Sequence, residues 1–261
     1  MLSTVRKCGR ILDLFGKDHP ELGVTEVAKA LRIPKTTAQQ MLATLSSIGL
    51  LRRTTDRRYR LGWKVLALSD SLLKSTEVRV EARQVMSQLV ARYGETVHLA
   101  VLDNDDVVYV DRVQGTHSVQ VALTWVGARL PGHCSAVGKV LLASREPSEV
   151  AQIVERQGLT VYTPRTISTL AALERQLVDA SRDGFAYDEE ESVPDLCCVA
   201  APIRDFRGDV IAALSMSLPT FRFDRGRDQY RDAVVRAAGE ISDRLGYMSR
   251  RPRLVVSRAR A

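Results

Sequence analysis

The chain has 261 residues, 45% of them hydrophobic and 26% charged, which is typical of globular proteins and leaves room for two domains. It contains no apolar run of bilayer length, and the opening MLSTVRKCGR lacks a signal-peptide core, so we expect a cytoplasmic protein with no membrane partner. The cysteines Cys8, Cys134, Cys197 and Cys198 form no CxxC pair, which argues against a disulfide framework and fits a reducing compartment.

The net charge of +7 is concentrated at the two ends of the chain. Residues 1–74 carry 14 Lys/Arg and 6 Asp/Glu, whereas residues 75–249 carry 19 and 25. The segment 250–261 has five arginines and no acid, and its composition predicts a disordered tail with only non-specific DNA contacts. A basic N-terminal module joined to an acidic middle indicates a polyanion binder with a second function. An enzyme with basic termini remains the alternative.

The first 50 residues predict three helices, over Val5–Phe15, from Gly23 to Leu31 and over Ile33–Ile48, with a tight turn before the third. One apolar stripe of the third helix is expected to face the core: Ala38, Met41, Leu42, Leu45 and Ile48. Its opposite side offers a cation, hydroxyls and amides but no carboxylate: Lys35, Thr36, Thr37, Gln39, Gln40 and Ala43. Short helices joined by a tight turn indicate a helix-turn-helix, although this third helix alone could equally be an amphipathic surface helix.

A predicted β-hairpin follows. Gly49 ends the helix, and the segments 50–54 and 57–61 flank a polar turn. Five arginines lie within nine residues: Arg52, Arg53, Arg57, Arg58 and Arg60. A charge run is usually a solvated surface, but directly after a helix-turn-helix it favours a wing that contacts DNA. We therefore predict that these arginines bind duplex DNA together with Lys35, Thr36, Thr37, Gln39 and Gln40, because amides suit adenine edges and hydroxyls suit phosphates.

Several strings resemble the IclR family of bacterial transcriptional regulators. VTEVAKALRIPKTTAQQMLATLSSIGLLRR and RRYRLGWKVLALS look like its N-terminal winged helix, and GETVHLAVLDNDDVVYVDRV, RLPGHCSAVGKVLLA and YDEEESVPDLCCVAAPIRD fit the remainder. The last string approximates the family signature and departs from it at Arg204, where the family usually has an aromatic residue or histidine. The resemblance covers about Val5 to Leu245. It implies a winged helix-turn-helix over 1–62, a linker helix over 63–75 and a GAF-like effector-binding domain over 76–249.

Helices are expected next over Gly62–Lys74 and Glu77–Tyr93. Apolar residues, Trp63 among them, cover more than one face of the first, which suggests burial against a second subunit; packing within one chain is the alternative. The resemblance favours a homodimer on a palindromic operator and suggests a homotetramer, a pair of dimers, on DNA.

From residue 96 the pattern changes to strands, expected over 96–102, 107–113, 119–124, 184–188, 197–204 and 210–218. Helices are expected over 136–143, 147–157, 170–183 and 224–245. Strands, then a block of helices, then strands again indicate an α+β domain with an antiparallel sheet.

A ligand site is expected where a turn leads into a helix at residues 130–139. Small residues around Ser135–Gly138 leave backbone amides accessible, and two serines two apart on a strand share one face. By resemblance, effector-binding roles fall on Ala136, Val137, Asp188, Cys198, Ser215 and Ser217. Leu123, Trp125 and Leu130 are guesses for the lining. The expected effector is a small carboxylate or aromatic acid.

The serines and the acidic residues of this site also have a purely structural interpretation. Ser135 could only cap its helix, Ser215 and Ser217 could satisfy each other, and the acidic run 188–191 could be a solvated loop. A metal or thiol redox sensor could use His133, Cys134 and Cys198, and a cysteine hydrolase could add Asp188 to them. Metal-ligand spacing, a nucleophile elbow and nucleotide-binding motifs are missing from the sequence, so we expect no catalysis, no metal and no cofactor. We therefore predict a ligand-responsive transcriptional regulator, with repression favoured over activation.

Overall fold

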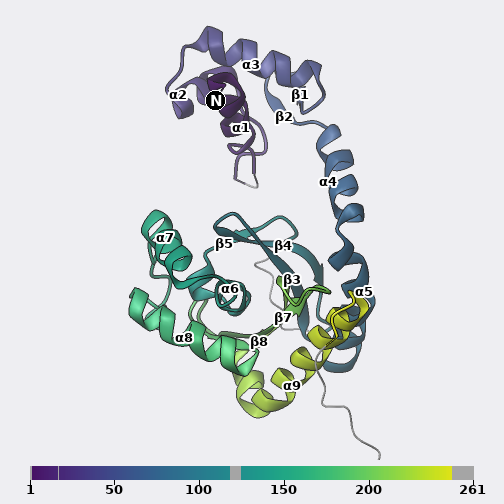
Figure 1. The fold of residues 1–261 in the computed structure, drawn as a ribbon. Coiled ribbons are helices and arrows are strands. Elements are labelled where there is room, and N and C mark those ends of the chain that lie inside the picture. Colours follow the sequence, from purple (N-terminus) through teal and green to yellow (C-terminus); the bar gives the residue numbers. More distant parts are fainter. Residues whose placement is uncertain (1, 17, 118–124, 249–261) are drawn as a thin grey trace, which may run out of the picture. The chain divides into compact units, whose positions relative to one another are not determined.

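The computed structural model describes residues 2–16, 18–117 and 125–248, and the chain forms two compact units, residues 1–75 and 76–261 (Figure 1). The strand expected over 119–124, with Leu123, and the tail over 250–261 lie outside the described residues. Within the described ranges, no helix combines the length and apolarity needed to span a bilayer.

The first unit packs short helices against a hairpin, as the sequence predicts. Its elements are α1 (Ser3–Leu12), α2 (Val24–Leu31), α3 (Lys35–Ser47), β1 (Leu51–Arg53), β2 (Tyr59–Leu61) and α4 (Lys64–Ser75). Arg32 ends α2 with φ 54°, and Gly49 follows α3 with φ 81°, so a residue in the left-handed region makes each turn. Backbone hydrogen bonds also join Leu22 to Tyr59, which ties β2 to the segment before α2.

The side chains predicted to form the apolar stripe of α3 pack into the core of this unit, with one exception. Ala38, Met41, Leu42 and Leu45 are buried. Ile48, in contrast, is 47% exposed, because the helix ends at Ser47 and the next residue lies outside the periodic pattern.

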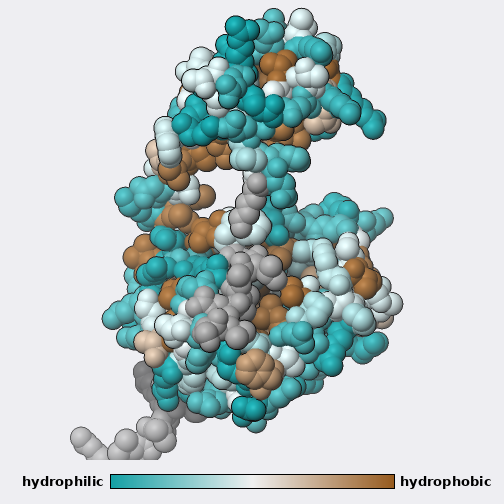
Figure 2. All heavy atoms as spheres, turned by 180° about the vertical axis from the view of Figure 1, so that it is seen from behind, coloured by the Kyte–Doolittle hydropathy of each residue, from teal (hydrophilic) through white to brown (hydrophobic). Residues whose placement is uncertain are grey.

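α4 contributes no side chain to a core, because none of its residues is buried. Trp63 just before it is 69% exposed, and Leu66, Leu68 and Leu72 are exposed too. Hydrophobic side chains gather over this helix on the left of Figure 2. A contiguous apolar surface of this kind usually marks a contact with another molecule.

The second unit is built on an antiparallel sheet with strand order β5-β4-β3-β8-β7-β6. The strands are β3 (Thr96–Asp103), β4 (Asp106–Val113), β5 (Arg129–Leu130), β6 (Ala186–Glu189), β7 (Leu196–Arg204) and β8 (Val210–Pro219). The helices are α5 (Glu77–Tyr93), α6 (Ala136–Leu142), α7 (Pro147–Gln157), α8 (Leu170–Asp183) and α9 (Thr220–Arg244), with a 3-10 turn at Gly132–Cys134. The fold is therefore α+β.

Helices cover both faces of this sheet (Figure 1). Val97, Leu99, Val199, Leu214 and Met216 face α5 and α9 and form the larger core. The other face is lined by smaller side chains and packs against α6, with α7 and α8 beyond it. Burial on both faces explains why β7 and β8 read as nearly continuous apolar runs.

The turn before α6 comes unusually close to the helix itself. A Cβ atom on Gly138 would lie 2.3 Å from the carbonyl oxygen of Gly132, so no larger residue fits at this contact. The start of α6 is thereby held against the turn, above the small residues Ala100, Ala200 and Ala213 of the sheet. This arrangement leaves space between the helix and the sheet.

Candidate functional site

The face of α3 that is predicted to contact DNA is exposed to solvent. Lys35, Thr36, Gln39 and Gln40 are exposed and Thr37 is partly exposed, while the opposite side of the helix is buried. This face carries one cation and no carboxylate. Such a surface can enter a major groove without electrostatic repulsion from phosphates.

The five wing arginines do not share one environment. Arg52, Arg53 and Arg57 are exposed, with the guanidinium of Arg52 4.8 Å from the centre of the Trp63 ring. Arg58 and Arg60 instead form ion pairs with Glu26, in the first turn of α2, and with Glu21, just before that helix. The sequence pattern alone groups all five as DNA contacts and does not reveal this difference.

A cavity of about 290 Å³ lies between the sheet and the start of α6. The six residues predicted for the effector all line it: Ala136, Val137, Asp188, Cys198, Ser215 and Ser217. Of the three guesses for the lining, Leu130 lines the cavity, Trp125 does not, and Leu123 lies outside the described residues. Three more lining residues, Pro131, Cys134 and Ser135, belong to the predicted turn. The others were not predicted: Tyr109, Arg129, Tyr162, Ser192, Val193 and Leu196.

Strand register explains why distant residues meet at this cavity. Asp188 on β6 pairs with Cys198 on β7, which in turn pairs with Ser217 on β8. Residues directly opposite one another on neighbouring strands project from the same face. Cys198 Sγ donates a hydrogen bond to Ser217 Oγ at 3.1 Å, and Ser217 Oγ lies 3.4 Å from His98 Nδ1.

The structural alternatives for the serines can now be separated. Ser135 does cap α6, because its Oγ accepts a hydrogen bond from the Gly138 amide at 3.2 Å. Ser217 bonds to Cys198 rather than to Ser215. The Ser215 hydroxyl has no hydrogen-bond partner among the described residues, and it lines the cavity. It is therefore a free polar group at the site.

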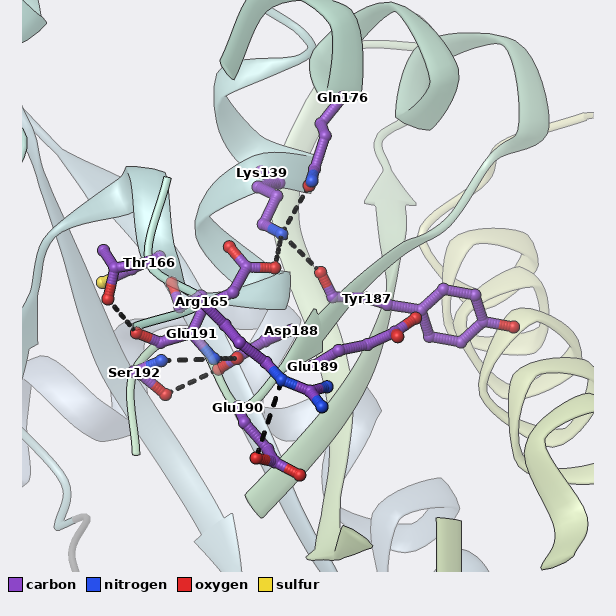
Figure 3. Close-up of polar contacts among 12 residues, drawn as sticks. Lys139, Arg165, Thr166, Gln176, Tyr187, Asp188, Glu189, Glu190, Glu191 and Ser192 are labelled. Carbon is purple, nitrogen blue, oxygen red and sulfur yellow. Dashed lines mark hydrogen bonds and ion pairs between the residues drawn. The ribbon is translucent and has the colours of Figure 1, made fainter. Parts of the chain in front are cut away.

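Asp188 is buried at the cavity wall, which excludes a solvated loop for this residue. Its Oδ1 accepts the Glu191 amide at 2.8 Å, and its Oδ2 accepts the Ser192 hydroxyl at 2.6 Å (Figure 3). Burial raises the pKa of Asp188 to about 6, although these hydrogen bonds act in the opposite direction. The carboxyl can thus change protonation near neutral pH.

Behind the cavity lies a buried cation that the sequence analysis missed. Lys139 points from α6 toward Glu191, with which it forms an ion pair, and it also donates to Gln176 Oε1 and to the Tyr187 carbonyl, each at 2.6 Å (Figure 3). A lysine within the otherwise apolar helix AVGKVLL was the available signal, because a fully buried lysine requires a partner.

The cavity thiols are poor nucleophiles. Burial raises the pKa of Cys134 to about 12, and it raises the pKa of Cys198 as well. Burial likewise lowers the pKa of His98 to about 3, so this imidazole is neutral. Cys197 belongs to the opposite face of the sheet, beside Thr220 on α9. In the described part of the chain, no three His, Cys, Asp or Glu residues are grouped to hold a metal ion.

A winged helix-turn-helix followed by a sheet domain with an internal cavity defines a DNA-binding transcriptional regulator with a separate effector domain. The comparison with protein families supports this class for both units of the chain. Residues 4–55 match the IclR helix-turn-helix domain, and residues 70–243 match the bacterial transcriptional regulator IclR C-terminal domain. The chain therefore belongs to the IclR family, whose members are transcriptional regulators and not enzymes.

Two relatives match along almost their whole length. The HTH-type transcriptional regulator XynR of Escherichia coli is 32% identical, covering 95% of this chain and 98% of that protein, and KdgR of the same organism is 34% identical with 94% of each covered. Among solved structures, an IclR homolog from Microbacterium hydrocarbonoxydans in complex with 4-hydroxybenzoate superposes with a TM-score of 0.81. It is 28% identical, over 93% of this chain and 99% of that one.

Proposed function

We propose that this protein is a ligand-responsive transcriptional repressor, acting in the cytoplasm, whose cavity binds a small organic acid and thereby changes operator affinity. The proposal rests on the cavity, which is lined by residues from α6, β6, β7 and β8. A ligand there contacts elements more than 80 residues apart in the chain. It can therefore favour one arrangement of the domain, which is the requirement for any allosteric effect.

The lining indicates what kind of acid fits. Hydrogen-bond donors are available from the Ser215 and Tyr109 hydroxyls and from the amides of Ala136 and Val137 at the start of α6. Arg129, the cation of the lining, is already paired with Asp103 and Asp106 at 2.6 and 3.0 Å. A carboxylate would thus be held by neutral donors.

The part of the cavity lined by Asp188 suits a hydroxyl group. Asp188 is a hydrogen-bond acceptor when ionised, and the charges nearest to it are those of the buried Lys139–Glu191 ion pair. A ligand with a carboxylate at one end and a hydroxyl at the other would use both walls. The 4-hydroxybenzoate bound by the Microbacterium homolog has this bipolar form, and we propose the same chemical class here.

On DNA, we propose a homodimer that places one α3 helix in each of two major grooves, with half-sites ~34 Å apart. The exposed apolar surface of α4 supports a dimer contact through this helix. A pair of dimers on one operator is a further part of the proposal.

A two-stage experiment tests the proposal. A panel of hydroxylated and plain carboxylic acids, 4-hydroxybenzoate included, would be screened by thermal shift, because a ligand that binds only the folded protein raises its melting temperature. Acids that bind would then be added to a mobility-shift assay with the protein's own promoter region. We expect at least one acid to release the DNA. Acids that stabilise the protein without changing DNA affinity would contradict the regulatory role.

A further inference from the structure

Arg58 and Arg60 differ from the other wing arginines in having acidic partners within the same unit. Arg58 Nη2 lies 2.7 and 3.0 Å from the two carboxylate oxygens of Glu26 and also donates to the Glu21 carbonyl at 3.0 Å. The guanidinium of Arg60 pairs with the Glu21 carboxylate. Arg58, just before β2, thus meets a carboxylate in the first turn of α2, and Arg60 on β2 meets one from the segment before that helix.

The partner residues already have a structural task at this position. Glu26 Oε2 accepts the Gly23 amide at 2.6 Å and so caps the N-terminus of α2. The Gly23 amide and the Arg58 guanidinium together hold the pKa of Glu26 below its usual range. One carboxylate therefore links the start of the helix-turn-helix to the wing.

The remaining wing arginines have no such partner. Arg52 and Arg53 lie over the Trp63 and Tyr59 rings, and Arg57 is exposed near the tip of the hairpin. Within residues 2–16, 18–117 and 125–248, none of the three forms a salt bridge. Their charges are uncompensated and available to phosphates.

We propose that Arg58 and Arg60 are positioning residues, which fix the wing to the start of α2 through Glu26 and Glu21, and that Arg52, Arg53 and Arg57 supply the phosphate contacts of the wing. Half-exposed ion pairs add little to folding stability, so their value here is geometric. They hold the hairpin at a set distance from α2, and hence from α3. This inference rests on the proposed binding of DNA.

Salt dependence separates a phosphate contact from a positioning role. Each phosphate contact that is lost lowers the slope of log affinity against log salt by about 0.9. The slope would be measured on one duplex by fluorescence anisotropy for the full chain and for Arg58→Gln and Arg57→Gln. We expect Arg57→Gln to lower the slope by about this amount. Arg58→Gln should weaken binding with the slope unchanged.

A second pair of variants uses the acidic partner. Glu26→Gln keeps an acceptor for the Gly23 amide but removes the charge that holds Arg58. Asp56→Asn removes one charge from the wing turn, where this exposed residue forms no ion pair within the described ranges, and it serves as the matched control. If Arg58 only positions the wing, Glu26→Gln should bind DNA less tightly than Asp56→Asn.

The opposite results would overturn the proposal. A slope for Arg58→Gln reduced as much as for Arg57→Gln would make Arg58 a phosphate contact, as would tighter binding by Glu26→Gln than by Asp56→Asn, because the released arginine would then reach DNA. Wild-type protein without salt-dependent binding would instead contradict the proposed function as a whole.

Discussion

Lys139 on α6 and Glu191 after β6 form an ion pair almost entirely removed from water, with side chains 1% and 7% exposed. The ammonium has three protons, and Glu191, Gln176 and the Tyr187 carbonyl accept all three. One cation thus connects α6, α8, β6 and the loop that supplies the Glu191 and Ser192 amides to Asp188 (Figure 3). The back of the cavity depends on this contact.

Replacing Lys139 by Met should destabilise the second unit by about 3–5 kcal/mol, because Glu191 would be left charged and buried. Denaturant unfolding followed by circular dichroism would measure the loss. The double variant Lys139→Met with Glu191→Leu should recover most of it, since removing both charges is far less costly than removing one. A loss below about 1 kcal/mol in the single variant would show that the pair does not support the fold.

The stability of the second unit should depend on the protonation of Asp188. Burial raises the pKa of this carboxyl to about 6 from 3.8, so the folded state binds its proton more tightly than the unfolded state does. The resulting stabilisation is present below about pH 4 and is lost as pH rises through 6. Over that window it amounts to about 3 kcal/mol.

Asp188→Asn isolates this contribution, because asparagine has the same size and does not titrate. Unfolding free energies of wild type and variant would be compared from pH 4 to pH 7. The variant should gain stability relative to wild type as pH rises. Parallel curves would mean that Asp188 keeps an ordinary pKa.

Ser215 and Ser217 should respond differently to removal of their hydroxyls. The Ser215 hydroxyl has no partner among the described residues, so Ser215→Ala should weaken binding of an acid ligand and leave unfolding unchanged. Ser217→Ala removes the acceptor of Cys198 and should cost about 0.5–1.5 kcal/mol of folding stability. Calorimetry with a ligand from the thermal-shift panel measures the first effect and denaturant unfolding the second. Equal stability losses in both variants would contradict a ligand role for Ser215.

Gln40 should contribute to base recognition, because its exposed amide lies on the open face of α3. Gln40→Ala should weaken operator binding by ~1–3 kcal/mol and leave binding to random duplex unchanged. Anisotropy titrations against the two duplexes, with the exposed Thr44 changed to Ala as a neighbouring control, measure the difference. Equal weakening on both duplexes would indicate a phosphate contact or a folding defect instead.

Local patterns were sufficient for most of the fold. The stripe of α3, the turn at Thr55-Asp56 and the β-branched strands each depend on residues close in sequence, so their periodicity predicts the element directly. The differences lie at the ends of elements. The last helix begins at Thr220 rather than Asp224 and is kinked at Gly226, and β6 begins at Ala186 because Gly184, with φ 75°, ends α8. β5 has two residues and carries no pattern to detect.

Only part of the site could be predicted from the sequence, because contacts between residues far apart in the chain leave no local pattern. Resemblance supplied six of the residues that line the cavity, but partners far apart in sequence stayed hidden. Tyr109 reaches the cavity beside a register shift at Leu99/Ala100, which no alternation rule anticipates. Lys139 and Glu191 are 52 positions apart, and Arg58 and Glu26 are 32 apart, so neither pairing leaves a local signal.

The backbone contact between Gly132 and Gly138 also limits how the cavity can be redesigned. Because no side chain separates the two glycines, a larger residue at Gly138 would push the Gly132 turn away from the start of α6 and distort the cavity. To accept larger or smaller acids, a lining side chain such as that of Tyr109 or Leu196 should instead be replaced by a shorter or a longer one. Both side chains border the cavity, so a change in their length alters its volume directly.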